Sequence, residues 1–140
     1  MTSEEVAAFL AAERVLTVAT LGRDGWPHLM PLWYVVRAGE CWAWTYAKSQ
    51  KVRNLERDPR CTLQVEAGDR YDQLRGVMIK AECELIRDPE AVAALGLEVY
   101  ERYGGPLSDE ARAAALRQAP KRIAMRFVAR ETATWDHGKL

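Results

Sequence analysis

Apolar and polar positions alternate along much of the chain with the two-residue period of β-strands. The clearest example lies between Val77 and Leu85, where every second residue is apolar and most of the residues between them are charged. Shorter runs rich in β-branched and aromatic residues are bounded by turn residues. Together these patterns predict six strands, at Val15–Thr20, Trp26–Val36, Cys41–Tyr46, Cys61–Glu66, Val77–Leu85 and Arg122–Arg130.

The run from Trp26 to Val36 differs from the others because it is apolar on both alternating faces. Leu29 and Trp33 share one face, and Met30 and Tyr34 share the other. A strand without a polar face is typical of strands covered on both sides. We therefore expect this strand to be buried on both faces.

Capping and breaking residues predict the helices. Thr2 and Glu5 have capping-box spacing, and Ser49 stands where it can cap a short helix. Prolines and glycines mark the other boundaries. The predicted helices start at Thr2 for about three turns, at Ser49 ending at Arg57, at Pro89 ending near Gly104, and at Ser108 ending before Pro120.

Six strands joined mostly by hairpin-length turns favour a mainly β fold, a closed or nearly closed antiparallel barrel with peripheral helices, since closure removes exposed strand edges. The two helices between Asp88 and Ala119 form an excursion before the last strand. The chain has 140 residues and shows no repeat, low-complexity tract or linker. A single domain spanning residues 1–140 is therefore expected.

Composition excludes several classes of partner. The chain has 20 basic and 20 acidic residues, so its net charge gives no reason to expect binding to nucleic acid or an anionic membrane. Its first residues are acidic, unlike a signal peptide, and no apolar run approaches the roughly 20 residues that span a bilayer. Three widely spaced cysteines fit neither a disulfide framework nor a zinc site. We expect a soluble protein of the reducing cytoplasm.

The chain lacks the usual catalytic motifs. Its two histidines, His28 and His137, do not lie near a serine or cysteine in a nucleophile motif, and they are too few for a zinc site. There is no Gly-x-Gly-x-x-Gly sequence and no P-loop. No catalytic residue and no metal site are assigned, and any demanding chemistry is expected to need a bound cofactor.

One segment has the features of an anion site. The chain has five lysines, and two of them, Lys48 and Lys51, fall within four positions, where a strand leads directly into a helix. Free N–H groups at the helix start, the helix dipole and the hydroxyls of Thr45 and Ser49 would converge there with the two ammonium groups, an arrangement that suits a phosphate. The alternative is that Ser49 only caps a surface helix whose lysines are solvated. These physical considerations alone do not choose between the two.

The order of several fragments resembles a known family. These fragments are Asp24–His28, Pro31–Tyr34, Ser49–Arg60 and Arg75-Gly76. The chain resembles the flavin and deazaflavin oxidoreductases of the pyridoxamine-phosphate-oxidase-like class. The resemblance implies a six-stranded split β-barrel of the FMN-binding type. It also implies a homodimer with two cofactor sites at the subunit interface, which would cover the apolar strand.

The resemblance also implies roles for individual residues. Lys51 falls where the family has a phosphate-binding lysine, and Trp44-Thr45 falls on an aromatic and hydroxyl pair ahead of it. The segment Leu29–Tyr34 falls on the strand that borders the flavin ring. For the tryptophans, core packing is the simpler role, and for the two arginines, surface ion pairing is. The candidate cofactor-binding residues are Pro31, Leu32, Trp33, Trp44, Thr45, Lys48, Ser49, Gln50, Lys51, Arg53 and Arg75.

Departures from the family refine its functional implication. Leu29 stands where the true oxidases have an arginine for the flavin phosphate, Gly76 stands where they have a glutamine, and their basic C-terminal motif is missing. Oxidation of pyridoxamine phosphate is therefore not expected. The Ser-x-Lys-x-x-Asn-Leu pattern looks more like members that use the deazaflavin coenzyme (F-420), and FMN is the other candidate.

The expected activity is hydride transfer to or from a small organic substrate, and the alternative is a protein that binds such a ligand without turnover. The segment Trp135–Lys139 is a candidate to reach the partner subunit's cofactor.

Overall fold

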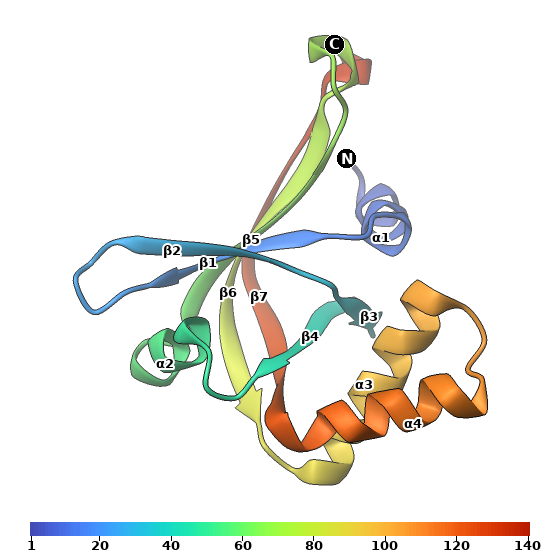
Figure 1. The fold of residues 1–140 in the computed structure, drawn as a ribbon. Coiled ribbons are helices and arrows are strands. Elements are labelled where there is room, and N and C mark those ends of the chain that lie inside the picture. The colour runs from blue at the N-terminus through green and yellow to red at the C-terminus, as the bar shows by residue number, and fades with distance from the viewer.

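The computed structural model describes residues 1–140 and shows one antiparallel sheet that curls into a half-barrel (Figure 1). The sheet has seven strands in the order β2-β1-β5-β6-β7-β4-β3, so that β2 and β3 form its two edges. The mainly β, split-barrel prediction is confirmed. The strands are β1 (Leu16–Leu21), β2 (Pro27–Leu32), β3 (Val35–Arg37), β4 (Glu40–Tyr46), β5 (Arg60–Ala67), β6 (Arg75–Ile86) and β7 (Arg122–Asp136).

The prediction of six strands is wrong because the Trp26–Val36 run is interrupted at Trp33 and Tyr34. The backbone N–H of Tyr34 donates to the hydroxyl of Tyr103, 2.9 Å away, instead of to a neighbouring strand. The two halves of the run then pair at opposite edges of the sheet, β2 with β1 and β3 with β4.

The expectation that this run is covered on both sides is also wrong within one chain. Strand β2 pairs only with β1, and its residues Leu29 and Met30 lie on opposite faces of the sheet. Leu29 is 60 % exposed and Met30 is 41 % exposed. The apolar pattern of β2 therefore has no explanation inside a single subunit.

The four predicted helices are confirmed. Thr2 and Glu5 form the expected capping box, and the carboxylate of Asp88 accepts a hydrogen bond from Ala91 N. Ser49 occupies the N-cap position of its helix, but its side chain makes no capping hydrogen bond. The helices are α1 (Ser3–Ala12), α2 (Gln50–Arg57), α3 (Pro89–Gly104) and α4 (Asp109–Gln118).

Two apolar clusters hold the fold together. The larger one fills the barrel and includes Phe9 and Leu10 from α1, which close one end of it. The smaller one lies between β4 and α3 and is centred on Trp44. Gly96 of α3 makes this packing possible, because a Cβ at that position would lie 2.3 Å from Trp44 Cζ3. Helix α3 is thereby fixed against the strand that leads to the candidate site.

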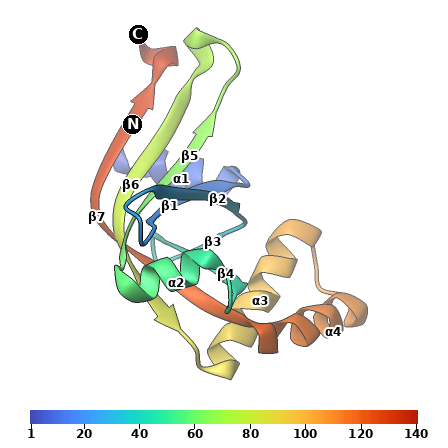
Figure 2. The same ribbon diagram turned by 60° about the vertical axis from the view of Figure 1, so that its left-hand side comes forward.

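Strands β5, β6 and β7 extend beyond the barrel as a projecting arm, residues 65–76 and 132–140, with the C-terminus at its tip (Figures 1 and 2). The prediction that the last strand ends at Arg130 is wrong, because residues 132–136 continue to pair with β6. At the tip the rings of Tyr71 and His137 lie 4.6 Å apart. The amine of Met1 donates to Thr134 Oγ1 at 2.9 Å, which ties the start of the chain to the arm.

All three cysteines are free and buried. Burial raises the pKa of Cys41 to about 11 and that of Cys61 to about 12, and it raises the pKa of Cys83 as well. The thiols are therefore protonated at neutral pH and serve as core packing groups.

No helix in the structure has both the length and the apolar composition that crossing a bilayer requires.

Candidate functional site

The predicted anion site lies where β4 ends and α2 begins. The backbone N–H of Ala47 donates to Lys121 O at 2.9 Å, and that of Ser49 donates to Tyr46 O at 3.0 Å. These bonds fix the turn between the two elements against the start of β7. The free N–H groups at the start of α2 and the positive end of its dipole are directed to this turn.

Lys51, in the first turn of α2, is the only buried charged residue of the chain, with 7 % of its surface exposed. Its ammonium makes no hydrogen bond or ion pair with another residue. Burial away from water lowers the pKa of Lys51, and the positive charge of Arg122 lowers it further. A buried charge without a partner is costly to the folded state. A bound anion at this position would reduce that cost.

Two residues with hydroxyl groups lie shortly before this lysine, where β4 leads through the turn into α2. Ser49 Oγ is buried and has no hydrogen-bond partner. Thr45, at the end of β4, is buried with 4 % of its surface exposed. An unpaired buried hydroxyl loses its bonds to water without gaining others. Ser49, Thr45 and Lys51 thus form a set of donors that fits a phosphate group.

A cavity of about 470 Å³ adjoins these residues, a volume in the usual range for small-molecule sites. It is mostly apolar and aromatic, and strand ends and helix α3 form its walls. The lining residues are Pro31, Leu32, Trp33, Trp44, Thr45, Tyr46, Val99, Tyr100, Tyr103, Gly104 and Arg122.

One wall of the cavity is a stacked aromatic pair. The rings of Trp33 and Tyr103 lie 4.3 Å apart with 3° between their planes. The hydroxyl of Tyr103 is held by the N–H of Tyr34 and by the guanidinium of Arg102, each at 2.9 Å. Such a flat, fixed surface suits a planar ring system.

Trp44 has a packing role in addition to lining the cavity. Its ring meets Tyr100 edge to face, with 6.3 Å between centroids, and it fills the space left by Gly96. The simpler role considered for this tryptophan, core packing, is therefore present in the structure. Its role in cofactor binding stays a prediction.

The structure brings some predicted residues together and leaves others apart. Pro31, Leu32, Trp33, Trp44 and Thr45 line the cavity, whereas Ser49 and Lys51 lie at the start of α2 and are not among the lining residues. Lys48 and Arg53 are exposed.

The other two predicted residues face different surroundings. Gln50 donates to Asn54 Oδ1 and lines a separate cavity of about 480 Å³ beside His28. Arg75 lies in the projecting arm, stacked 5.1 Å from the ring of Phe9. Within one chain Arg75 does not reach the cavity, and its role, like those of the others, stays a prediction.

Sequence reasoning missed six residues of the cavity, namely Tyr46, Val99, Tyr100, Tyr103, Gly104 and Arg122. Arg122 is opposite Tyr46 in the register of β4 and β7. The sequence pattern marks Arg122 only as the start of a strand, since it does not reveal which strands pair. The two tyrosines of α3 lie in the helical excursion before the last strand, where sequence reasoning placed no site residue.

A solved structure that resembles the chain along nearly its whole length is that of a conserved hypothetical protein, Rv2991, from Mycobacterium tuberculosis. The two share 47% sequence identity with a TM-score of 0.93, over 99% of this chain and 87% of that protein. No curated protein matches the chain significantly.

More distant structures share the fold and differ in function. An F420 reductase has 21% identity and a TM-score of 0.73, over 90% of this chain and 94% of that one. The heme storage protein HutZ from Vibrio cholerae has 17% identity and a TM-score of 0.73, over 95% and 92% of the two chains. Fold likeness alone therefore does not select a cofactor.

The sequence profile described as "Pyridoxamine 5'-phosphate oxidase" matches residues 2–136. This match covers nearly the whole chain and includes the turn that carries Ser49 and Lys51. The chain therefore belongs to the pyridoxamine 5′-phosphate oxidase family.

Proposed function

We propose that the chain binds a phosphate-bearing flavin, either FMN or the deazaflavin coenzyme (F-420), and uses it to transfer hydride to or from a small organic substrate. The observation that carries this proposal is at the start of α2, where Lys51 is a buried residue whose ammonium pairs with no other residue, and the buried hydroxyl of Ser49 is also unpaired. Both groups are donors, and a phosphate oxygen would satisfy them together. The cofactor, when bound, supplies the redox chemistry.

The aromatic cavity is the proposed place of the cofactor's ring system. Trp33 and Tyr103 provide a flat apolar surface, and the end of β2 at Pro31 and Leu32 provides the opposite border. These residues would orient the ring and exclude water from it. Both candidate cofactors have a tricyclic ring, a ribityl chain and a phosphate, so the same residues serve either. The likeness to an F420 reductase and the Ser-x-Lys-x-x-Asn-Leu pattern favour the deazaflavin slightly.

We further propose that the protein is a homodimer with its cofactor sites at the interface. Strand β2 exposes Leu29 and Met30, and Trp33 beside the cavity is 56 % exposed. A second subunit would cover these residues and close the cavity. The projecting arm, with Trp135 and Lys139 near its tip, is the segment best placed to extend over a neighbouring subunit (Figure 2).

One observation favours a second function, binding without turnover. The ionisable residues that line the cavity are Tyr46, Tyr100, Tyr103 and Arg122, so no carboxylate, histidine or cysteine is present to act as a general acid. A hydride transfer in which no side chain donates a proton does not need a general acid. A storage or carrier protein does not need one either.

Titration of the purified protein with FMN and with the deazaflavin coenzyme, followed by ligand fluorescence, tests the binding proposal. Lys51→Met should weaken binding by roughly 1.5 to 3 kcal/mol, because it removes a charge-assisted bond to phosphate. Lys121→Met removes the same charge from an exposed position and should leave the dissociation constant unchanged. If the wild-type protein binds neither cofactor, or Lys51→Met binds as tightly as wild type, the proposal is wrong.

Turnover is tested separately. The protein loaded with reduced cofactor is mixed with a panel of small unsaturated and carbonyl-conjugated compounds, and cofactor oxidation is followed by absorbance. Oxidation that depends on both protein and acceptor supports the oxidoreductase. Tight binding with no oxidation by any acceptor supports the carrier instead.

A further inference from the structure

We propose that Arg122 is a second phosphate-binding residue of this site and acts on the same anion as Lys51. This inference rests on the proposed function, because it assigns to one more residue the phosphate that Lys51 and Ser49 are proposed to hold.

The guanidinium of Arg122 is held between two aromatic rings. Its Cζ lies 4.1 Å from the ring centroid of Tyr46 and 4.9 Å from that of Trp44. Stacking on rings covers the faces of a guanidinium and leaves its N–H groups, which lie in its plane, free to donate. The buried Nε of Arg122 has no hydrogen-bond partner. The donors of this side chain are thus fixed in position and unused.

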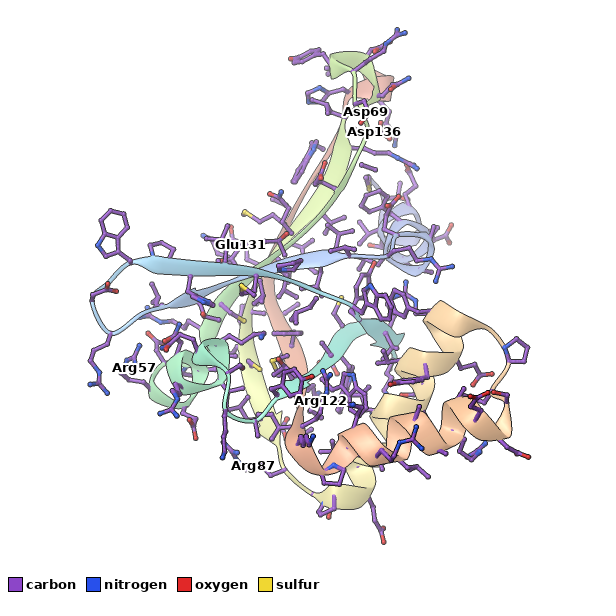
Figure 3. The ribbon with its side chains drawn as sticks, in the orientation of Figure 1. Arg57, Asp69, Arg87, Arg122, Glu131 and Asp136 are labelled. Atoms are coloured by element: carbon purple, nitrogen blue, oxygen red, sulfur yellow. The ribbon has the colours of Figure 1, made fainter.

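The place of Arg122 is set by strand pairing. It is the first residue of β7 and is opposite Tyr46, the last residue of β4, directly before the turn into α2 (Figure 3). The carbonyl of the preceding residue, Lys121, accepts from Ala47 N at 2.9 Å in that turn. Arg122 also lines the cavity. Arg122 therefore lies at the cavity and next to the turn that leads into the helix of Lys51.

The absence of a carboxylate partner sets Arg122 apart from many other arginines of the chain. Neither Arg122 nor Lys51 pairs with a carboxylate, and the positive charge of Arg122 lowers the pKa of Lys51. Two cations that repel each other, with unused donors, leave one anion as the group that satisfies both. The arginines that do pair with a carboxylate are Arg37, Arg60, Arg70, Arg87, Arg126 and Arg130.

The test compares the binding of each cofactor with that of its phosphate-free form. FMN is compared with riboflavin, and the deazaflavin coenzyme is compared with the deazaflavin that carries only the ribityl chain. The ratio of the two dissociation constants measures the contribution of the phosphate. Arg122→Met should reduce this ratio by about 10-fold or more, the usual effect of losing a charge-assisted hydrogen bond. Binding of the phosphate-free form should stay within about two-fold of wild type, because methionine preserves much of the apolar packing.

Two further variants serve as controls. Arg122→Lys keeps the charge and should recover part of the ratio, and Lys121→Met, at the neighbouring exposed position, should not change it. Thermal unfolding of each variant shows that it is folded at the temperature of the titration.

Two outcomes would overturn the inference. If Arg122→Met weakens the phosphorylated and phosphate-free forms equally, Arg122 only supports the cavity wall. The proposed function then stands, provided that Lys51→Met still changes the ratio. If the wild-type protein binds both forms with the same affinity, no phosphate site exists, and the proposed function fails with the inference.

Discussion

We expect Lys51 to destabilise the folded protein in the absence of a ligand, because the residue is buried and its ammonium has no counter-ion. Lys51→Met removes this charge and keeps most of the apolar stem. We expect the variant without cofactor to be more stable than wild type by about 1 to 2 kcal/mol. Urea unfolding of the two proteins measures the difference.

The control for this prediction is the same experiment at saturating cofactor. Bound cofactor stabilises wild type through mass action and should stabilise the variant less. The difference in unfolding free energy between the two proteins should therefore become smaller or change sign. A variant that is less stable than wild type without ligand would show that Lys51 has a protein partner in solution.

The same lysine predicts a pH dependence. The pKa of Lys51 is lower in the folded protein than its ordinary value of 10.5, so the unfolded chain binds more protons between the two values. The cost of burying the charge is fully present below the folded pKa, falls as pH rises between the folded value and 10.5, and is gone above 10.5. The stability difference between wild type and Lys51→Met should therefore shrink on the alkaline side.

Anion binding should show the opposite trend over the same pH range. A neutral amine does not attract phosphate, so cofactor affinity should fall as pH rises through the pKa of Lys51. Titrations between neutral pH and pH about 10.5 give this profile. Lys51→Arg, whose charge persists throughout, should bind with little dependence on pH in that range. Identical profiles for the two proteins would remove Lys51 from the site.

At the scale of elements, helix α3 forms a wall of the cavity through a close contact at Gly96. Gly→Ala inside a helix usually stabilises a protein by about 1 kcal/mol. Here the new Cβ would lie 2.3 Å from Trp44 Cζ3, so α3 or the Trp44 ring must move. We expect Gly96→Ala to destabilise the protein by about 1 to 3 kcal/mol, as overpacking does.

The matched control is Gly104→Ala, at the end of the same helix, where a Cβ would meet no atom within 4 Å. Its stability should be equal to wild type or slightly higher. Urea unfolding of both variants decides the matter, and equal effects at the two positions would mean that α3 does not pack closely on Trp44.

Most elements were predictable because their signals are local. The capping box at Thr2 and Glu5, the Asp88 cap and the alternation around Ile79 each depend on neighbouring residues, and each gave the correct element. The break at Tyr34 was not predictable, because it depends on a hydrogen bond to Tyr103 in a distant helix. The extension of β7 past Arg130 likewise depends on pairing with β6.

The residues of the candidate site also fall into those marked by local sequence and those that only tertiary pairing brings close. Ser49 and Lys51 are close in sequence, and a motif was enough to bring attention to them. Arg122 becomes their neighbour only through the pairing of β4 with β7.

At the scale of the whole molecule, the exposed apolar surface of β2 predicts self-association. Met30→Glu places a charge on this edge strand, where it would be buried between subunits at high cost. We expect wild type to sediment as a dimer and the variant to sediment as a monomer in analytical ultracentrifugation. Leu116→Glu, at a similarly exposed apolar position on helix α4, should leave the dimer intact.

Monomeric wild type at all concentrations would contradict the proposed dimer. If Met30→Glu is monomeric and has also lost cofactor affinity, the two sites are completed by the partner subunit. Retained affinity in the monomer would mean that one subunit is sufficient.

The stacked pair of Trp33 and Tyr103 also places a fluorescent indole at the cavity. Trp33 and Trp44 line it, whereas Trp26 lies on the β1–β2 turn, 74 % exposed. A tricyclic ring placed against these indoles accepts their excitation energy, so the protein's own ultraviolet emission should dim as ligand is added. Trp33→Phe should remove a share of that dimming, and Trp26→Phe should remove less. The chain thus carries a built-in reporter of occupancy, which needs no label and works for coloured ligands of unknown identity.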